Sequence, residues 1–445
     1  MGSETIAPAP DQADAAVAWV RGDRLGLALP AHPEALRDGG EAFLTQAFRA
    51  MGALASDNAV VAIDRCEDFT GGGTGKKLVL TVRYARAGPP ADLFVKFSRN
   101  FDDPIFDRAK RHMEPEIRLA ALSRAPGFPI ATPACLYGDF HAESGTGVLI
   151  TERIAFGASG IEPHRPKCLD HTLADPLARY QALIRAAARL AGTHKAGRLP
   201  ASVAEQFPFD LDAALAKDRL PDPDRLARKV AQIAAFQADY PKLLPEAVLP
   251  PDFLARFESE AQLFLAHEAA IKRLLHANPD LIALCHWNAN IDNAWFWADA
   301  AGEIQCGLMD WGSVGQMSVA MTLWGCLSGM ETAMWAAHLG ELLDLFVREF
   351  EGCGGPKLDP AELRLHLQLY VVMMGLAWLM DAPARIRREP VDLAAAEGPH
   401  DPRFTASETA RVQRLMMVNV LNLWRTSDLG LTLCKRFGSP PGPGS

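Results

Sequence analysis

The chain has 445 residues, of which 49% are hydrophobic and 22% are charged, and its formal net charge is -9. This composition is that of a globular protein too long for one small core, and it argues against a disordered or fibrous chain. The acidic balance disfavours a nucleic-acid partner, and no apolar run reaches the roughly 18–20 residues that a membrane helix requires.

The N-terminal part and the cysteines favour a cytoplasmic protein. Residues 1–40, which begin with an Ala- and Pro-rich stretch, are predicted as a flexible leader and lack the basic start and apolar core of a secretory signal. The eight cysteines are scattered with no Cys-x-x-Cys pair, which indicates reduced thiols and disfavours a cysteine zinc site.

Residues 41–155 are predicted to form a small lobe with an antiparallel sheet. A helix is expected over 34–54, because its apolar residues recur at steps of four. Strands follow at 59–69, 76–85 and 92–98, separated by a glycine-rich turn and a Gly-Pro-Pro turn. A helix over 106–125, with Pro115 as a break or first turn, precedes two more strands at 132–140 and 146–154.

Residues 156–436 are predicted to form a larger, mostly helical lobe, and 437–445 a flexible tail. Helical segments at 176–197 and 251–278 precede a hairpin whose strands, 295–299 and 303–310, flank an Ala-Ala-Gly turn. More helices follow from 319 to 437. The fold class is therefore α+β, with two lobes.

A glycine run lies between the first two predicted strands. Gly72, Gly73 and Gly75 would let backbone amides approach the phosphates of a nucleotide, although a plain hairpin turn has the same composition. A Walker-type loop is excluded, because Thr70 stands at its first glycine and Lys77 at its Ser or Thr.

Lys96 lies inside an apolar strand, where an ammonium group is costly to bury unless it is paired. A phosphate and a carboxylate are the expected partners. Glu116, on the following helix, is the favoured carboxylate, and Glu114 is its rival.

The segment CHWNANIDN, followed by a hairpin and Met-Asp-Trp, carries the most specific pattern of the chain. His286, Asn288 and Asn293 have the spacing H-x-N-x-x-x-x-N, and Asp310 follows Asn293 by seventeen positions. Amide and carboxylate oxygens such as those of Asn293 and Asp310 suit Mg²⁺, which prefers oxygen ligands.

Asn288 stands where a kinase catalytic loop has the aspartate that accepts the proton of the substrate hydroxyl. An amide orients a hydroxyl but is not basic, so a slower enzyme is expected. Asp292 is the alternative base. A nucleophilic Cys285 beside His286 is a third hypothesis, disfavoured because adjacent residues of a strand point to opposite faces.

With these residues the chain resembles the aminoglycoside phosphotransferase and choline kinase superfamily of kinase-like proteins, and within it the ecdysteroid-kinase-like branch. The resemblance spans about residues 40–430 and rests on FLTQAFRAMGAL, the glycine turn, LFVKFS, EIRLAAL, GVLITERI, CHWNANIDN and MDW. Where the family motif reads H-G-D-x-x-x-x-N, this chain has Trp287 for the glycine and Asn288 for the aspartate.

The resemblance implies an ATP- and Mg²⁺-dependent kinase acting on a hydroxyl of a small molecule. It implies that Lys96, with Glu116 as its partner, binds the nucleotide phosphates, and that Glu152 to Ile154 form the hinge beside adenine. Asn293 and Asp310 would hold magnesium, and His286 would brace the loop. The alternative is a catalytically silent relative that binds nucleotide or a small ligand.

Overall fold

The computed structural model describes residues 18–71 and 75–438, which divide into two compact units. The first unit runs to Ala155 and also contains Leu308–Val314, and the second comprises Phe156–Gly307 and the chain from Gly315 onward. The predicted second lobe included residues 308–314, whereas the structure groups them with the first unit. Among the described residues, no helix combines the length and apolarity needed to cross a membrane.

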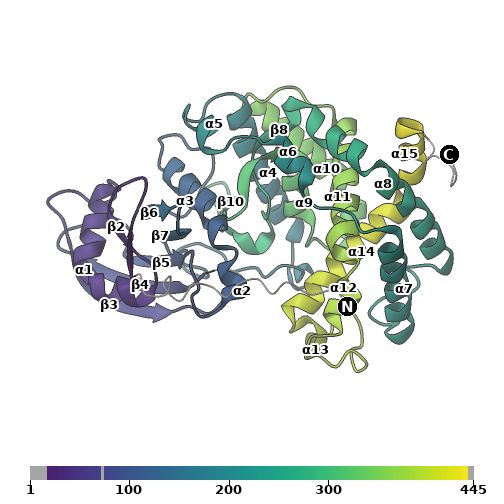
Figure 1. Ribbon diagram of the computed structural model, residues 1–445, viewed down its shortest axis with the longest axis horizontal. Helices are drawn as coiled ribbons and strands as arrows, with labels where there is room; N and C mark the ends of the chain where they lie inside the picture. The colour runs from purple at the N-terminus through teal and green to yellow at the C-terminus, as the bar shows by residue number, and fades with distance from the viewer. Residues whose placement is uncertain (1–17, 72–74, 439–445) are drawn as a thin grey trace, which may run out of the picture. The chain divides into compact units, whose positions relative to one another are not determined.

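The first unit is built on a five-stranded sheet with the order β3-β4-β5-β7-β6, in which all neighbouring strands are antiparallel. The strands are β3 (Val60–Asp68), β4 (Lys77–Tyr84), β5 (Asp92–Phe97), β6 (Cys135–His141) and β7 (Thr146–Glu152). Three helical segments separate β5 from β6, namely α2 (Pro104–Asp107), η2 (Lys110–His112) and α3 (Met113–Leu122). The predicted antiparallel sheet is confirmed (Figure 1).

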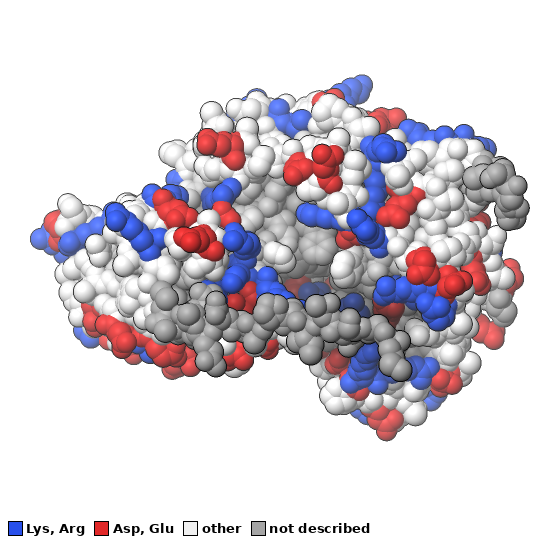
Figure 2. All heavy atoms as spheres, in the orientation of Figure 1, with Lys and Arg blue, Asp and Glu red and all other residues white. Residues whose placement is uncertain are grey.

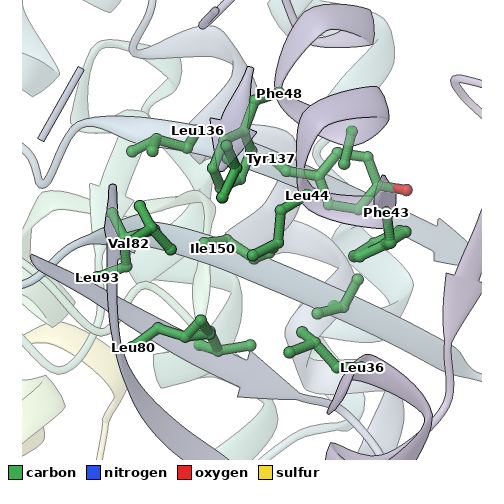
Figure 3. Close-up of a cluster of buried hydrophobic side chains, with 14 of the residues drawn as sticks. Leu36, Phe43, Leu44, Phe48, Leu80, Val82, Leu93, Leu136, Tyr137 and Ile150 are labelled. Atoms are coloured by element: carbon green, nitrogen blue, oxygen red, sulfur yellow. The ribbon is translucent and has the colours of Figure 1, made fainter. Parts of the chain in front are cut away.

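Helix α1 (Pro33–Ala50) packs its apolar stripe on one face of this sheet. Figure 3 shows Leu44 and Phe48 of α1 among Leu80, Val82 and Ile150 of the strands, and all five side chains are buried. Burying a side chain of this size stabilises the fold by roughly 1.5–3 kcal/mol. The core of the first unit therefore lies between α1 and the sheet.

The predicted leader over residues 1–40 is wrong from residue 18 onward, while residues 1–17 lie outside the described part. A hairpin of β1 (Trp19–Arg21) and β2 (Ala28–Pro30) precedes α1. Leu29 is fully buried, because it belongs to the same core as α1. An Ala- and Pro-rich composition obscured these few apolar anchors.

Helix α3 begins at Met113 and not at residue 106, which places Pro115 in its first turn. Proline is tolerated there because the first amides of a helix have no partner within it. The start of α3 positions Glu116 on the buried side of the helix, where it is 6% exposed.

The second unit is mostly helical (Figure 1), and the predicted α+β class is confirmed. Two short strand pairs lie in it, β8 with β11 and β9 with β10. The predicted hairpin around Ala-Ala-Gly is present as β9 and β10, with Gly302 at φ 83° in the turn. Helix α15 includes Phe437, the first residue of the predicted tail, and 439–445 lie outside the described residues.

Along the chain, the strands of the second unit lie between an earlier and a later group of helices. The earlier helices and the first three strands are η3 (Asp170–Thr172), α4 (Pro176–Lys195), α5 (Val203–Gln206), α6 (Leu211–Ala216), α7 (Pro223–Asp239), α8 (Pro251–Ala277), η4 (Pro279–Leu281), β8 (Ile282–His286), η5 (Ile291–Asn293), β9 (Ala294–Ala298) and β10 (Ile304–Leu308). The last strand and the later helices are β11 (Val314–Ser318), α9 (Val319–Leu327), α10 (Thr332–Gly352), α11 (Pro360–Met374), the π-helix η6 (Gly375–Leu379), α12 (Ala382–Ile386), α13 (Pro402–Thr405), α14 (Glu408–Thr426) and α15 (Leu429–Phe437).

Basic and acidic side chains are interspersed over much of the face shown in Figure 2. Surface ion pairs of the protein include Arg83 with Asp64 at 2.8 Å and Lys242 with Glu397 at 2.7 Å. Exposed pairs of this kind contribute little to stability, typically below about 1 kcal/mol. The buried charges therefore carry more information about function than the surface charges.

Candidate active site

Lys96 lies between two carboxylates in the first unit. Its Nζ is 2.7 Å from Oε1 of Glu116 and 2.6 Å from Oδ1 of Asp310. Glu114, the rival partner, instead forms an ion pair with Arg118 one turn along α3. The structure therefore joins strand β5, helix α3 and the segment 308–314 at one half-buried ammonium group.

Backbone contacts hold the Asp310 segment against the rest of this unit. The amide of Leu308 donates to the carbonyl of Ala131 at 3.0 Å, and the amide of Trp311 donates to Oε1 of Glu116 at 3.3 Å. The Trp311 side chain is 4% exposed and donates from Nε1 to the Leu308 carbonyl at 3.0 Å. Glu116 of α3 thus accepts hydrogen bonds from Lys96 of β5 and from the amide of Trp311 in the segment 308–314.

The electrostatic balance keeps Lys96 protonated. Burial acts to lower the pKa of Lys96, but the charges of Glu116 and Asp310 outweigh it and raise that pKa. Burial raises the pKa of Glu116, while Lys96 and the Trp311 amide oppose that rise. A charged ammonium with two acidic neighbours is suited to hold an anionic group near a bound cation.

Asp310 has a left-handed backbone conformation, with φ of 61°. Few non-glycine residues adopt it, although Asp and Asn do so more readily than others. Its side chain is 53% exposed, in contrast to the buried Glu116. Strained backbone of this kind is found disproportionately at functional sites.

The glycine turn approaches the end of β5. Gly72 and Gly73 lie outside the described residues, whereas Gly75 has φ of 63° and closely approaches the backbone of Phe97. A Cβ on Gly75 would lie 1.7 Å from the Phe97 carbonyl oxygen, so only glycine fits there.

Lys77 is a second cation of this region that the motif analysis did not assign. It pairs in register with Lys96 across β4 and β5, so the two side chains share one face of the sheet. Its Nζ donates to the Gly71 carbonyl at 2.9 Å. Burial lowers the pKa of Lys77, and the charge of Lys96 acts in the same direction.

A small pocket of about 30 Å³ opens beside Lys96. Its lining includes Ser98, Lys110, Glu116, Asp310 and Gly312. Its volume corresponds to roughly one water molecule, so in the first unit taken by itself it accommodates a single polar group and not a whole nucleotide.

The predicted hinge lies at the end of β7. Leu93 of β5 pairs in register with Glu152, and the amide of Glu152 donates to the Ala134 carbonyl at 2.8 Å. Glu152 ends the strand, and Ile154 follows it as a half-buried residue.

The predicted catalytic loop lies in the second unit, immediately after β8. His286 ends that strand with 1% exposure, and its carbonyl accepts a hydrogen bond from the hydroxyl of Thr322 at 2.8 Å. The amide of Asn288 donates to Nδ1 of His286 at 3.2 Å. His286 therefore supports the backbone of the loop.

A chain of hydrogen bonds fixes the side chain of Asn288. Ser328 donates from Oγ to Oδ1 of Asn290 at 2.9 Å, so the Asn290 amide nitrogen is directed to Asn288. That nitrogen donates to Oδ1 of Asn288 at 2.7 Å. Asn288 therefore has its oxygen engaged by one hydrogen bond, and its NH₂ group is available to a ligand as a donor. Sequence reasoning missed Asn290 and Ser328, since no motif marks them.

Asn293 and Asp292 lie in the short helix η5. Asn293 is 8% exposed and donates from Nδ2 to the Asn288 carbonyl at 2.9 Å, which leaves its oxygen as the atom for a cation. The carboxylate of Asp292 is 3.1 Å from Nζ of Lys167, another residue that the motif did not reveal. The carboxylate of Asp292 is therefore already engaged in an ion pair.

Two further contacts explain residues around the loop. The indole nitrogen of Trp287 donates to the hydroxyl of Tyr370 at 2.8 Å, so this tryptophan anchors the loop to α11. Cys285 is 2% exposed, and burial raises the pKa of its thiol. A thiol kept neutral in the core is a poor nucleophile, which argues against the cysteine-based hypothesis.

Known structures with a likeness to this chain include some that are named as kinases and phosphotransferases. One is an aminoglycoside-3'-phosphotransferase of type VIII, 22% identical, with 68% of this chain and 93% of that chain covered and a TM-score of 0.34. A choline/ethanolamine kinase family protein from Mesorhizobium loti is 19% identical, with coverage of 80% and 92% and a TM-score of 0.35.

A choline kinase from Cryptosporidium parvum Iowa II is 10% identical, with coverage of 81% and 89% and a TM-score of 0.43. No family model and no curated protein matches the chain. At identities and TM-scores this low, the function has to be argued from the residues of the chain itself.

Proposed function

We propose that this protein is an ATP- and Mg²⁺-dependent phosphotransferase that acts on a hydroxyl group of a small molecule. The observation that carries the proposal is the half-buried Lys96 held between Glu116 and Asp310, at 2.7 and 2.6 Å. The second unit adds a loop with the spacing H-x-N-x-x-x-x-N, whose histidine and asparagines are hydrogen-bonded to one another. The cytoplasm, where thiols stay reduced, is the expected compartment for its eight free cysteines.

Lys96 is assigned to the nucleotide phosphates. Its charge is maintained by Glu116, so the bond to Asp310 is the one that a phosphate would replace. The backbone of Gly72, Gly73 and Gly75 is assigned to the same phosphates. Glu152 to Ile154 are assigned to the adenine side, next to the sheet that carries Lys96.

Mg²⁺ is assigned to Asp310 and Asn293. The donor set fits this ion, because Asp310 has a half-exposed carboxylate and Asn293 has an amide oxygen whose nitrogen is already engaged. When bound, the ion would neutralise charge on the phosphates during transfer. The two residues belong to different units, so the proposal requires both units to contribute to the site.

Asn288 supplies orientation and no base in this proposal. Transfer through a loose transition state depends mostly on positioning and on electrostatic stabilisation, so loss of the base slows the reaction without abolishing it. General-base assistance is worth roughly 10²–10⁴-fold. His286 would brace the loop, and Asp292 is disfavoured as a substitute base by its ion pair with Lys167.

A second candidate is a silent relative that binds nucleotide or a small ligand. The hydrogen bond from Asn290 to Oδ1 of Asn288 favours it, because this amide is held in place with its NH₂ group available as a donor and has no basicity for the proton of a hydroxyl. A donor at this point binds a carboxylate or phosphate oxygen more readily than it positions a hydroxyl for attack.

Both candidate functions include nucleotide binding, and calorimetric titration with MgATP tests it. Lys96→Met should weaken binding by at least about tenfold, the loss expected for one charged contact. Lys242→Met is the matched control, because Lys242 forms only a surface pair with Glu397 at 2.7 Å. Equal affinity of the wild type and Lys96→Met would refute the nucleotide site.

Turnover separates the two candidates. The wild type and Asn288→Asp are incubated with MgATP and a panel of hydroxylated small molecules, and product phosphate esters are measured. A slow wild type and a variant that is roughly 10²–10⁴-fold faster would establish the phosphotransferase. MgATP binding without turnover in either protein, over the whole panel, would establish the silent binder.

A further inference from the structure

Two histidines and one glutamate from three separate segments of the second unit converge on one point. His171 belongs to η3, Glu331 caps the N-terminus of α10, and His400 lies in the loop before α13. Their ligand-type atoms all lie within 4.8 Å of one another. None of the three belongs to the H-x-N-x-x-x-x-N loop or to the set assigned to nucleotide and Mg²⁺.

The spacing of these atoms is that of ligands around a metal ion. Nδ1 of His171 is 3.5 Å and Nε2 of His400 is 3.2 Å from Oε1 of Glu331. Ligands at 2.0–2.1 Å from a tetrahedral Zn²⁺ are separated by about 3.3 Å. Charge-assisted hydrogen bonds are shorter, typically about 2.7–2.9 Å, as between Lys96 and Glu116 at 2.7 Å.

The two imidazole rings are stacked, with centroids 4.0 Å apart and an angle of 12° between their planes. One nitrogen of each ring lies near the same carboxylate oxygen, and one ring must rotate for the in-plane lone pairs of both to reach one ion. The His400 side chain is 50% exposed, whereas those of His171 and Glu331 are 21% exposed. The cluster is therefore open to solvent on one side, which leaves room for water as an additional ligand.

A buried second carboxylate supports the cluster. Asp170 is 2% exposed and accepts hydrogen bonds from the Glu331 amide at 3.3 Å and from the Tyr180 hydroxyl at 2.7 Å. Its Oδ1 is buried and has no hydrogen-bond partner within the described part of the chain. Asp170 thus fixes the backbone at Glu331 and supports the position of that ligand.

We propose that His171, Glu331 and His400 form a binding site for a divalent transition-metal ion, with Zn²⁺ as the physiological class. Two imidazoles and a carboxylate with open positions are a donor set for Zn²⁺, Ni²⁺ or Cu²⁺ and a poor one for Mg²⁺ or Ca²⁺. The site is independent of the magnesium ligands Asn293 and Asp310. By joining η3, α10 and the loop that precedes α13, the ion would hold that loop on the helical unit.

Arg414 is a positively charged group near the cluster that acts against the binding of a metal ion. Its guanidinium is buried, interacts electrostatically with Glu331 and donates to the Leu243 carbonyl at 2.6 Å. A cation near the carboxylate weakens the attraction for a second cation, so micromolar rather than nanomolar affinity is expected.

Metal titration of the full-length protein tests the site. Protein stripped with a chelator and then freed of it is titrated with Zn²⁺ in a calorimeter at neutral pH. One ion per chain with Kd of about 10 µM or tighter is expected. His171→Ala and His400→Ala should each weaken binding by at least about tenfold, the effect of losing one good ligand.

His338→Ala is the matched control. His338 also lies beside a surface glutamate, with Nδ1 at 3.4 Å from Oε2 of Glu341, but the cluster around His171 does not include it. This variant should bind Zn²⁺ as the wild type does. Co²⁺ substitution gives a second readout, because its visible absorption reports nitrogen ligands and should be lost in both cluster variants.

Two results would overturn the proposal: the absence of saturable Zn²⁺ binding to the wild type, or unchanged binding in both His171→Ala and His400→Ala. Unfolding midpoints of the metal-free variants, compared with the metal-free wild type, show whether either substitution disturbs the fold. If one does, His171→Asn and His400→Asn replace them, and Zn²⁺ binding by those folded variants at wild-type affinity would equally refute the site.

Discussion

At the scale of single residues, the most informative feature is that the polar groups of the candidate site are engaged with one another. Lys96 is held by two acids, and Asn288 is held by Asn290. These contacts fix which atoms face outward, so they decide the chemistry as much as the residue types do. Asn288 illustrates this, because its oxygen accepts from Asn290 while its NH₂ group is available to a ligand as a donor.

Asp310 allows a direct measurement of backbone strain. Asp310→Gly and Asp310→Ala both remove the carboxylate and its bond to Lys96, so they differ only in how they tolerate φ of 61°. Alanine is disfavoured by roughly 1–2 kcal/mol in this conformation, whereas glycine is not. Urea unfolding should therefore show the glycine variant to be more stable than the alanine variant by about 1 kcal/mol. Equal stabilities would mean that the segment relaxes out of this conformation.

His194, near the end of α4, should make the stability of the protein depend on pH. Burial lowers the pKa of His194 to about 4, and the charge of Lys195 acts in the same direction. Its Nδ1 is buried without a hydrogen-bond partner in the described part of the chain. The unfolded chain, with a histidine pKa of about 6.5, then binds more protons than the folded chain between pH 6.5 and 4.

Because the unfolded chain binds more protons than the folded chain, the free energy of unfolding should fall as the pH drops from 6.5 to 4. In His194→Gln this contribution is absent, so the variant should lose less stability between pH 7 and pH 5 than the wild type does. Chemical unfolding at a series of pH values measures both slopes. Parallel slopes would show that His194 is protonated equally in the folded and unfolded states.

At the scale of elements, helix α9 determines the position of the loop after β8. Gly325 of α9 lies so close to the loop that a Cβ would be 2.1 Å from the Trp287 carbonyl oxygen and 3.2 Å from the Ala289 amide. Thr322 and Ser328, on and just after the same helix, donate to the carbonyl of His286 and the side chain of Asn290. The loop is therefore packed against a helix with no space between them.

Gly325→Ala should destabilise the protein by about 1–3 kcal/mol, because the contact is with backbone atoms that cannot rotate away. The matched control is Gly352→Ala at the end of α10, where a Cβ would meet no atom within 4 Å. There, alanine should be neutral or stabilising by up to about 1 kcal/mol, since glycine is the poorer helix former. Guanidinium unfolding of both variants distinguishes the two sites, and similar values would contradict the close packing of α9.

Elements with a strong local pattern could be predicted from the sequence, and contacts between distant segments could not. The strands around the glycine turn, the hairpin of β9 and β10 and the start of α3 near Pro115 follow from alternation, turn residues and proline chemistry. The hairpin of β1 and β2 has only three residues in each strand, too few for alternation to be visible.

The same distinction holds for the candidate site. Asn293 and Asp310 were predicted from their spacing and Lys96 from its place inside an apolar strand. Asn290 within the loop, and Lys167 and Ser328 outside it, carry no motif. Their roles depend on which helix packs on the loop, and that is decided by tertiary structure. Lys77 could have been found only from the strand register, which pairs it with Lys96 across β4 and β5.

At the scale of the whole molecule, the division into two units predicts which parts of the chain open together. The segment Leu308–Val314 follows β9 and β10 in sequence, yet it belongs to the first unit. The amides of Leu308 and Trp311 donate to Ala131 and Glu116, both of which lie before residue 155. Hydrogen exchange under native conditions should therefore group these two amides with those of the sheet and not with those of α9.

A pair of core substitutions tests this grouping. Leu80 is fully buried in the first unit and Phe346 in the second, and truncation of either to alanine costs roughly 2–5 kcal/mol. Leu80→Ala should accelerate exchange of the Leu308 and Trp311 amides, because opening of the sheet releases their acceptors. Phe346→Ala should leave them protected while it accelerates exchange in α10. If both substitutions accelerated these two amides equally, the chain would open as one cooperative body, and the segment that carries Asp310 would not be tied to the first unit in particular.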